Sequence, residues 1–301
     1  MAVVETVSRI APTPSGYLHI GNAFNFLFTW LVCNKQHGKL ILRIDDLDQA
    51  RIRPEYLQDV FRTIDWLGIT VDEGPSGPDD YLSNYSQVHR LALYEEAIQR
   101  IKDQLFPCAY SRKQIQATSS DGQYPIEFRD QGISMETEGV AWRILTPDSH
   151  KISWTDHVIG EVEVSLFDHM RDFVVRKKDG MASYQIASLI DDLQLGVTCI
   201  CRGEDLLHST AAQLYLASLL KRKEFSQTYF YHHHLLTDNV GEKLSKSHAS
   251  LSMYETGYSS DLRQHLFNEI LQKVGRAPNS IQNAEELGNS LSLKEIIQIG
   301  I

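Results

Sequence analysis

The sequence predicts an α/β fold in which an open, doubly wound parallel sheet carries a small inserted subdomain. Two observations support this. The first 44 residues read as strand, loop, helix and strand, a βαβ unit that implies a parallel sheet. A second α/β half resumes near Asp172, after an irregular stretch. In such a sheet, ligands bind in the crevice outside the carboxyl ends of the strands.

The first βαβ unit has the clearest pattern. Residues 3–10 are a short apolar strand, which two prolines and a glycine in residues 11–16 bring to an end. Helical spacing of apolar residues follows as far as Gly38, which stands just past the expected helix end. The residues with this spacing are Ile20, Phe24, Leu27, Phe28, Leu31 and Val32. A second strand over 39–44 ends in the acidic cluster Asp45-Asp46-Leu47-Asp48.

Two further helices complete the first half, residues 1–105. Pro54 stands where one helix begins, and Gly68 follows its end. The buried stripes of the two helices are Leu57, Val60, Phe61, Ile64 and Leu67, and then Leu91, Tyr94, Ile98, Ile101 and Leu105. From residue 106 to 170 the pattern changes to short alternating pieces such as 152–154 and 158–164. We therefore predict an inserted, β-rich subdomain there.

The second half of the α/β domain is expected over residues 171–250. Strands are predicted at 173–175 and 197–201. Ser209-Thr210 is the expected N-cap of a helix that runs to Leu220. Beyond a polar loop, residues 261–274 have the pattern of one more helix, and residues 251–301 are expected to be a short helical C-terminal segment.

Composition limits the class of protein. The 301 residues are 42% hydrophobic and 23% charged, which is typical of an ordinary soluble globular protein. No run of 18 or more apolar residues predicts a membrane span, and the N-terminus lacks the blocks of a secretory signal. The cysteines are scattered, which favours reduced thiols and a cytoplasmic location. They are Cys33, Cys108, Cys199 and Cys201.

The net charge of −10 disfavours a general nucleic-acid coat protein, because binding a phosphate backbone needs local lysine and arginine. A tRNA partner is compatible with this charge only if basic residues gather on one face. Arg176-Lys177-Lys178 and Lys221-Arg222-Lys223 are the candidates. The alternative is that both runs are solvated surface.

A first motif occupies the loop between the first strand and its helix. It reads Arg9-Ile10-Ala11-Pro12-Thr13-Pro14-Ser15-Gly16-Tyr17-Leu18-His19-Ile20-Gly21-Asn22. Free backbone N–H groups and the helix dipole make this a natural phosphate site. Gly21 lets a nucleotide approach closely, and His19 can donate to a phosphate oxygen. The alternative is that His19 only caps the helix or lies on the surface.

A second motif is Gly241-Glu242-Lys243-Leu244-Ser245-Lys246-Ser247. Two lysines three residues apart, among small polar residues, suit a loop that folds over a polyphosphate. Taken alone, such a loop is more often a solvated surface.

Together the two motifs resemble the signature loops of class I aminoacyl-tRNA synthetases, with Leu244 in the methionine place of the lysine loop. The glutamyl branch matches more fully. Its motifs resemble Arg43-Ile44-Asp45-Asp46-Leu47-Asp48, Ser183-Tyr184-Gln185-Ile186-Ala187, Asp191-Asp192 and Arg202-Gly203-Glu204-Asp205-Leu206-Leu207. The similarity runs from about residue 7 to 250. It implies a Rossmann-type catalytic domain, with the insertion near the acceptor end of tRNA.

The resemblance also implies how glutamate is held. Arg202 occupies the position that grips the side-chain carboxylate, where a guanidinium can form two parallel charge-assisted bonds. Glutamine would face those donors with an NH2 group and leave them unpaired. The remaining glutamate-binding positions of the family fall on Arg9, Ala11, Thr13, Asp45 and Tyr184. Without the motif, the alternative for Arg202 is a surface ion pair with Glu204 or Asp205.

The implied chemistry is attack of the substrate α-carboxylate on the α-phosphorus of ATP, with loss of pyrophosphate. Negative charge accumulates on phosphate oxygens, so preorganised positive donors lower the barrier. His19 and Lys246 fit this catalytic task, with Lys243 in support. The ATP-binding set is His19, Gly21, Asn22, Lys243 and Lys246, and Mg²⁺ is expected on the phosphates.

Several positions depart from the family pattern. Asn22 replaces the last histidine of the first signature. Asp45 replaces the usual bacterial glutamate and is one methylene shorter, so either the substrate sits deeper or a water bridges the gap. Of the zinc ligands of shortened glutamyl enzymes, only Cys108 and Tyr124 remain, and we predict no zinc.

Two other groups of residues invite a metal or ligand interpretation. Cys199 and Cys201 would share one face of a strand, and we predict buried free thiols there in preference to a metal site. His232-His233-His234 is expected on a strand near the adenine pocket.

Residues 247–301 are too short for the helical anticodon-binding domains of a full glutamyl enzyme. This length, with the short insertion, resembles the glutamyl-Q tRNA(Asp) synthetases, which attach glutamate to the queuosine base of tRNA(Asp). We expect a monomer that takes L-glutamate, ATP and tRNA(Asp). The alternatives are a core or fragment of a glutamyl-tRNA synthetase that charges tRNA(Glu), a non-catalytic glutamate- or tRNA-binding paralogue, and another nucleotidyl transferase. Intact His19, Lys243 and Lys246 argue against a pure binder, and Arg9, Tyr184 and Arg202 argue against the last.

Overall fold

The computed structural model of the chain describes residues 5–119, 123–149, 151–235, 252–278 and 281–301. Within these residues the larger sheet has six strands in the order β2-β1-β8-β9-β5-β6. Its strands are β1 (Val7–Ile10), β2 (Lys39–Leu42), β5 (Lys151–Asp156), β6 (Gly160–Ser165), β8 (Cys199–Gly203) and β9 (Tyr229–His233). Neighbouring strands are parallel, except that β6 runs antiparallel to β5. The predicted doubly wound parallel sheet is confirmed.

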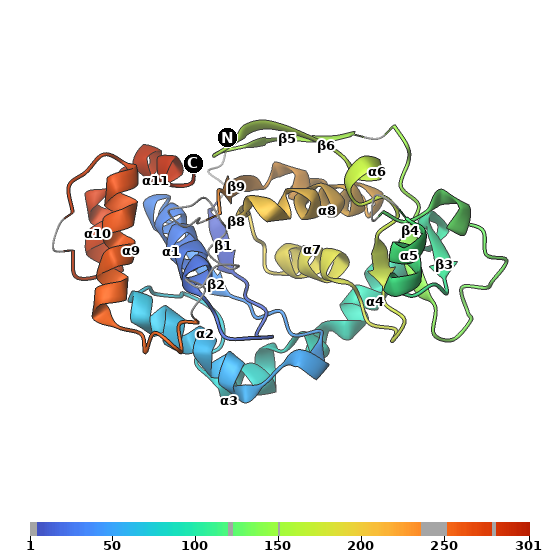
Figure 1. Cartoon of the computed structure of the whole chain (residues 1–301), viewed down its shortest axis with the longest axis horizontal. Helices are drawn as coiled ribbons and strands as arrows, with labels where there is room; N and C mark the ends of the chain where they lie inside the picture. Colours follow the sequence, from blue (N-terminus) through green and yellow to red (C-terminus); the bar gives the residue numbers. More distant parts are fainter. Residues whose placement is uncertain (1–4, 120–122, 150, 236–251, 279–280) are drawn as a thin grey trace.

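Helices pack on both faces of this sheet (Figure 1). One core surrounds α1 (Ile20–Lys35), and the other surrounds α7 (Tyr184–Gln194) and α8 (Leu207–Leu219). Side chains along a strand alternate between the two faces. Cys199 and Cys201 therefore join the α1 core, whereas Ile200 between them joins the α7–α8 core. Both cysteines are free and buried, as predicted.

The helices after β2 follow the predicted pattern in part. α2 (Pro54–Leu67) has Pro54 in its first turn and ends at Gly68, whose φ of 67° is left-handed. α3 (Pro78–Asp80) is a single turn. α4 (Leu91–Arg100) is shorter than expected, because a 3₁₀ turn at Lys102–Gln104 unwinds the chain and Leu105 begins β3 (Leu105–Cys108).

A smaller antiparallel sheet, in the order β3-β4-β7, lies at the opposite end of the molecule from the C-terminal helices (Figure 1). Its other elements are β4 (Ala141–Ile144), β7 (Val174–Arg176) and α5 (Arg112–Thr118). The sequence placed residues 173–175 in the second half of the main domain, and that placement is wrong. β7 pairs antiparallel with β4, and within this pairing the guanidinium of Arg176 lies 4.7 Å from the ring centre of Trp142.

The hairpin β5–β6 belongs to the larger sheet, although its residues were expected inside the insertion. Asp156 of β5 pairs in parallel with Phe230 of β9. Trp154 also packs on Phe230, with ring centroids 6.3 Å apart, and covers the inner face of the hairpin. Residues 106–170 are thus divided between the two sheets, and α6 (Leu166–His169) leads back toward the smaller one.

The predicted N-cap of α8 is wrong. A 3₁₀ turn at Glu204–Leu206 starts the helix early, so α8 begins at Leu207. Thr210 consequently lies inside the helix, where its hydroxyl meets the backbone oxygen of Leu206 and the ring of His232. A polar residue before an apolar stripe predicted a cap, but the hydroxyl instead serves a buried contact.

Three C-terminal helices, α9 (Ser260–Lys273), α10 (Ala284–Ser290) and α11 (Leu293–Ile299), complete the α1 side of the molecule (Figure 1). The pattern after residue 276 was too weak to predict the last two. Asn283 and Ser292 cap them, and their apolar residues Leu287, Ile296 and Ile299 are buried in the α1 core. Among the described residues, no helix combines the length and the apolar character that a bilayer crossing requires.

Candidate active site

Two cavities open where β1, β8 and β9 end, at the point where the order of the sheet reverses. We call them the His19 cavity and the Asp45 cavity. The His19 cavity, of about 240 Å³, is lined by His19, Gly21, Asn22, Phe24, Asn25, Gly203, Asp205, Leu206, His233 and Leu235. The Asp45 cavity, of about 200 Å³, is lined by Thr13, Asp45, Leu47, Asp48, Gln87, Lys177, Ala182, Tyr184, Ala187 and Ser188.

His19 is the N-cap of α1. Its Nδ1 atom accepts from the backbone N–H of Gly21 at 3.1 Å, and the Asn22 side chain accepts from the backbone N–H of His19 at 3.0 Å. Because Nδ1 accepts, the neutral ring carries its proton on Nε2. The capping interpretation of His19 is correct, and the ring lies at the start of a helix that lines a cavity.

Two glycines keep the backbone of the His19 cavity bare. A Cβ atom on Gly21 would lie 3.0 Å from the His19 ring, and one on Gly203 would lie 2.6 Å from the Asp205 carboxylate. Any side chain at these positions would displace the groups that line the cavity. The close approach of a nucleotide to Gly21 stays a prediction.

A buried network of charges lies under the Asp45 cavity. Asp192 on α7 accepts from Arg9 Nε at 2.8 Å and from Arg43 Nη1 at 2.6 Å. Arg43 also donates to both carboxylate oxygens of Asp45, at 2.7 and 3.0 Å. Burial opposes ionisation of Asp192, but Arg9 and Arg43 prevail and hold the pKa of this carboxyl below its ordinary value. For Asp45, burial prevails over Arg43 and raises the pKa.

Further hydrogen bonds, made by the neighbouring Asp191, connect this network to the rest of the domain. Asp191 accepts from Arg90 Nε at 2.8 Å, from the Tyr94 hydroxyl at 2.7 Å and from Gln87 Nε2 at 2.9 Å. Gln87 also accepts from the backbone N–H of Asp46 at 2.8 Å. Adjacent acids on α7 thus hold the ends of β1 and β2 and the start of α4 in one arrangement.

Arg202 differs from its neighbours because its charge has no carboxylate partner in the described part of the chain. Its guanidinium is buried, and Nη1 donates to the amide oxygen of Gln213 at 3.0 Å. Nε and Nη2, which form one edge of the guanidinium, have no hydrogen-bond partner among the described residues. Burial lowers the pKa of Arg202 to about 10, with Tyr184 acting in the opposite direction. A surface ion pair with Glu204 or Asp205, the alternative for this arginine, is excluded by its burial.

His232 lies beside Arg202 on the neighbouring strand. The imidazole is fully buried between Asp156, whose oxygen is 2.6 Å from Nδ1, and the Thr210 hydroxyl, 2.8 Å from Nε2. Burial lowers the pKa of His232. His232 and His233 end β9 as predicted, and His233 lines the His19 cavity.

The structure does not place all of the sequence-predicted residues together. His19, Gly21 and Asn22 line one cavity, and Thr13, Asp45 and Tyr184 line the other. Arg9 and Arg202 are buried beneath them, and Ala11 is half-buried in the loop after β1. Lys243 and Lys246 lie outside the described residues.

Sequence reasoning missed Gln213, and it gave no role to Arg43, Gln87 or Asp192. The two acids of the Asp191-Asp192 motif mark the network in sequence, but no spacing signal points to Gln213.

The zinc-ligand remnants Cys108 and Tyr124 lie in a small apolar cluster with Ile115. The Tyr124 hydroxyl donates to the Phe128 backbone oxygen at 2.9 Å, and the guanidinium of Arg143 lies 4.2 Å from the centre of the Tyr124 ring. In the described ranges, no group of three or more His, Cys, Asp or Glu side chains is arranged to hold a metal ion.

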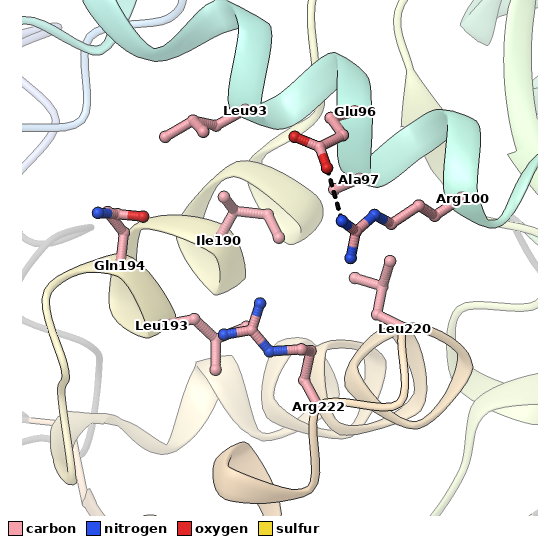
Figure 2. A pocket seen from close by; sticks show the side chains of 9 residues that line it. All are labelled: Leu93, Glu96, Ala97, Arg100, Ile190, Leu193, Gln194, Leu220 and Arg222. Carbon is pink, nitrogen blue, oxygen red and sulfur yellow. Dashed lines mark hydrogen bonds and ion pairs between the residues drawn. The ribbon is translucent and has the colours of Figure 1, made fainter.

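Some residues of the two basic runs, 176–178 and 221–223, line cavities or form hydrogen bonds. Lys177 lines the Asp45 cavity, and Lys178 Nζ donates to the Ala109 backbone oxygen at 2.5 Å. Arg222 lines a further cavity, between α4, α7 and the end of α8, where Arg100 pairs with Glu96 at 2.6 Å (Figure 2). The α7 residues of this cavity, Ile190, Leu193 and Gln194, lie on a different face of the helix from Tyr184, Ala187 and Ser188.

Comparison with known proteins agrees with this geometry. Residues 5–297 match the family of class I tRNA synthetases (E and Q), catalytic domain. The chain is 34% identical over 293 residues to a Glutamyl-Q tRNA(Asp) synthetase of Nitratidesulfovibrio vulgaris, covering 92% of this chain and 88% of that protein. It is 36% identical over 263 residues to a Glutamyl-Q tRNA(Asp) synthetase of Symbiobacterium thermophilum, covering 81% and 79%.

Solved structures show the same fold. A glutamate tRNA ligase from Elizabethkingia meningosepticum, in complex with its amino acid, has a TM-score of 0.74 at 22% identity. The glutamate-tRNA synthetase of Elizabethkingia anophelis has a TM-score of 0.72 at 24% identity. The matches cover 97% and 98% of this chain, but only 65% of each of those longer proteins. On the family match and the two relatives, the chain belongs to the class I glutamyl- and glutaminyl-tRNA synthetase family and, within it, to the glutamyl-Q tRNA(Asp) synthetases.

Proposed function

We propose that the chain activates L-glutamate with ATP to form glutamyl-adenylate and transfers the glutamyl group to the queuosine base of tRNA(Asp). The observation that carries this proposal is the buried guanidinium of Arg202, which has one edge without a partner. A buried cation needs a compensating charge, and a carboxylate supplies two oxygens with the spacing of that edge. The side chain of glutamate is such a group.

The other end of the substrate fits the Asp45 cavity. An ammonium group needs acceptors, and Asp45 retains lone pairs after it has accepted two bonds from Arg43. Thr13 and Tyr184 line the same cavity with hydroxyl groups. Arg9, held by Asp192, adds positive charge near the side-chain carboxylate. Glutamate would thus lie with its ammonium toward Asp45 and its side chain toward Arg202.

ATP is assigned to the His19 cavity, with its phosphates at the start of α1. An oxygen of the glutamate α-carboxylate attacks the α-phosphorus, the bond from that phosphorus to the bridging oxygen breaks, and pyrophosphate leaves. Mg²⁺ bound with the nucleotide would supply positive charge to the phosphate oxygens. Nε2 of His19 and the backbone N–H groups near Gly21 would stabilise the charge that develops on the phosphate oxygens. Lys243 and Lys246 are proposed to do the same from the lysine loop. The reaction would take place in the cytoplasm, with the segment 106–170 toward the tRNA.

Two assays test the proposal. Glutamate-dependent exchange of pyrophosphate into ATP, measured without tRNA, should proceed with the chain alone and should be at least about a hundredfold weaker with glutamine. Labelled glutamate should then transfer to queuosine-containing tRNA(Asp) and not to queuosine-free tRNA(Asp). Exchange that appears only when tRNA(Glu) is added would favour a glutamyl-tRNA synthetase core, and glutamate binding without any exchange would favour a non-catalytic paralogue.

A further inference from the structure

Gln213 lies on the face of α8 that covers β8 and β9, and it is fully buried. Its amide oxygen accepts from Arg202 Nη1 at 3.0 Å. One turn earlier on the same helix, Thr210 contacts His232, which stands beside Arg202 in the sheet. Two polar contacts therefore fix α8 against the strand ends at this point. The arginine can only donate, so the amide must present its oxygen to it.

The three buried arginines of the site are neutralised differently. Arg9 is paired with Asp192, and Arg43 is paired with both Asp192 and Asp45. Arg202 instead meets an uncharged amide, and the histidine beside it has a pKa that burial lowers. Asp192 is close enough to act on Arg202 electrostatically, but its oxygens accept from the other two arginines. Among the described residues, Arg202 therefore has no carboxylate that pairs with it directly.

We propose that Gln213 is a positioning and specificity-determining residue, which orients Arg202 through one neutral hydrogen bond and leaves the Nε–Nη2 edge free for an anionic substrate side chain. This inference rests on the proposed glutamate activation and adds to it a residue that does not touch the reacting atoms. A carboxylate at position 213 would pair with Arg202 and compete with the substrate. An apolar side chain would leave the guanidinium free to rotate out of line.

The side chain at position 213 therefore affects both the stability of the fold and the binding of the substrate. An uncharged acceptor costs the folded chain the stability of a full ion pair but keeps the edge of Arg202 available. The amide NH2 of Gln213, like Nε and Nη2 of Arg202, also has no hydrogen-bond partner among the described residues. All three donors suit an anion and none suits the NH2 group of glutamine.

The test compares Gln213→Glu and Gln213→Met with the wild-type chain, by pyrophosphate exchange without tRNA and by thermal unfolding. Gln213→Glu should raise the KM for glutamate on the order of a hundredfold, because the new carboxylate occupies Arg202, and should raise Tm. Gln213→Met should raise the same KM about tenfold and lower Tm. In both variants, the KM for ATP should stay within about threefold of the wild-type value. The ratio by which glutamate is preferred over glutamine should fall. Gln194→Glu, which adds the same charge at an exposed position, is the matched control.

The outcomes separate this inference from the proposed function. A glutamate KM within about threefold of wild type in both variants, or a parallel rise in the KM for ATP, would overturn the role of Gln213. If Gln213→Glu lowers Tm, the claim that Arg202 has no carboxylate partner among the described residues is overturned, whatever the exchange activity of the variant. If the wild-type chain does not exchange pyrophosphate with glutamate at all, the proposed function fails, while the opposite Tm shifts still report on the Arg202–Gln213 contact.

Discussion

Arg43 and Asp192 meet at 2.6 Å in the interior of the protein, although 149 residues separate them in the sequence. The contact joins the end of β2 to α7 and lies directly under the Asp45 cavity. It makes the geometry of the predicted ammonium-binding residue depend on a helix from the other half of the domain.

Asp192→Asn should lower the free energy of unfolding by about 3–5 kcal/mol, because it leaves Arg9 and Arg43 buried without their shared carboxylate. Urea denaturation followed by circular dichroism measures this. Asp65→Asn, at an exposed position on α2, should change the free energy of unfolding by less than about 0.5 kcal/mol. Equal effects of the two substitutions would contradict the role given to the network.

Acid should weaken the fold partly through the same residue. Since the folded pKa of Asp192 is below its ordinary value, its contribution is complete above the unfolded carboxyl pKa of about 3.9 and is lost as the pH falls through the folded value. Unfolding free energies measured between pH 7 and pH 3 should therefore decline less steeply in Asp192→Asn than in the wild-type chain. Parallel acid limbs would show that Asp192 does not contribute.

Arg202→Met should abolish glutamate-dependent pyrophosphate exchange and at the same time raise Tm by about 2–5 °C, because it removes a buried cation that pairs with no carboxylate in the described part of the chain. Scanning calorimetry and the exchange assay test both halves. Arg43→Met should instead lower Tm, since that arginine has two carboxylate partners. A higher Tm together with no exchange activity in Arg202→Met would show that this arginine serves substrate binding and does not stabilise the fold.

His19→Asn should reduce kcat for exchange about 100- to 1000-fold, because asparagine caps a helix well but cannot donate to the phosphates from the place of Nε2. Tm and the affinity for glutamate should change little, which calorimetry and equilibrium binding can check. His265→Asn, at an exposed position on α9, serves as the control. A large loss of Tm in His19→Asn would mean that the ring acts chiefly as a cap.

Metal removal should leave the small sheet intact. The cluster of Cys108, Ile115 and Tyr124 packs through apolar contacts and the Tyr124–Phe128 hydrogen bond. Dialysis against a chelator should therefore leave Tm unchanged. Tyr124→Phe should lower the free energy of unfolding by about 1 kcal/mol. A fall in Tm after chelation that Zn²⁺ restores would refute the prediction that no zinc is bound.

The parts of the fold that local chemistry determines were predictable. Pro54 and Gly68 mark α2 at both ends, and the glycine adopts the left-handed backbone that such an end requires. The partner of a strand is a different matter, because alternation fixes which face is buried and does not fix which strand lies alongside. For this reason β5 and β7 were placed in the wrong sheets, although their strand character was correct.

The site shows the same division. The family motifs describe the sequence around its signature residues, and the structure places His19, Gly21 and Asn22 in one cavity and Thr13, Asp45 and Tyr184 in the other. Gln213 could not be found this way, because a buried glutamine within an apolar helix has the same spacing whether it serves a core contact or an arginine. Only the position of α8 over β8 distinguishes the two.

The order of strands in the larger sheet has a consequence for how the protein is made. β1 leaves the ribosome before β8, which covers one of its edges and lies 191 residues later by the pairing of Ser8 with Cys199. At about 5–20 residues per second, the nascent chain carries that open edge for about 10–40 s. During most of this interval, Arg9 also lacks its ion-pair partner Asp192, which has not yet been synthesised. Stalled nascent chains that end before residue 190 are therefore expected to be cut readily by protease within β1 and to bind holdase chaperones, and chains that extend past β9 are not.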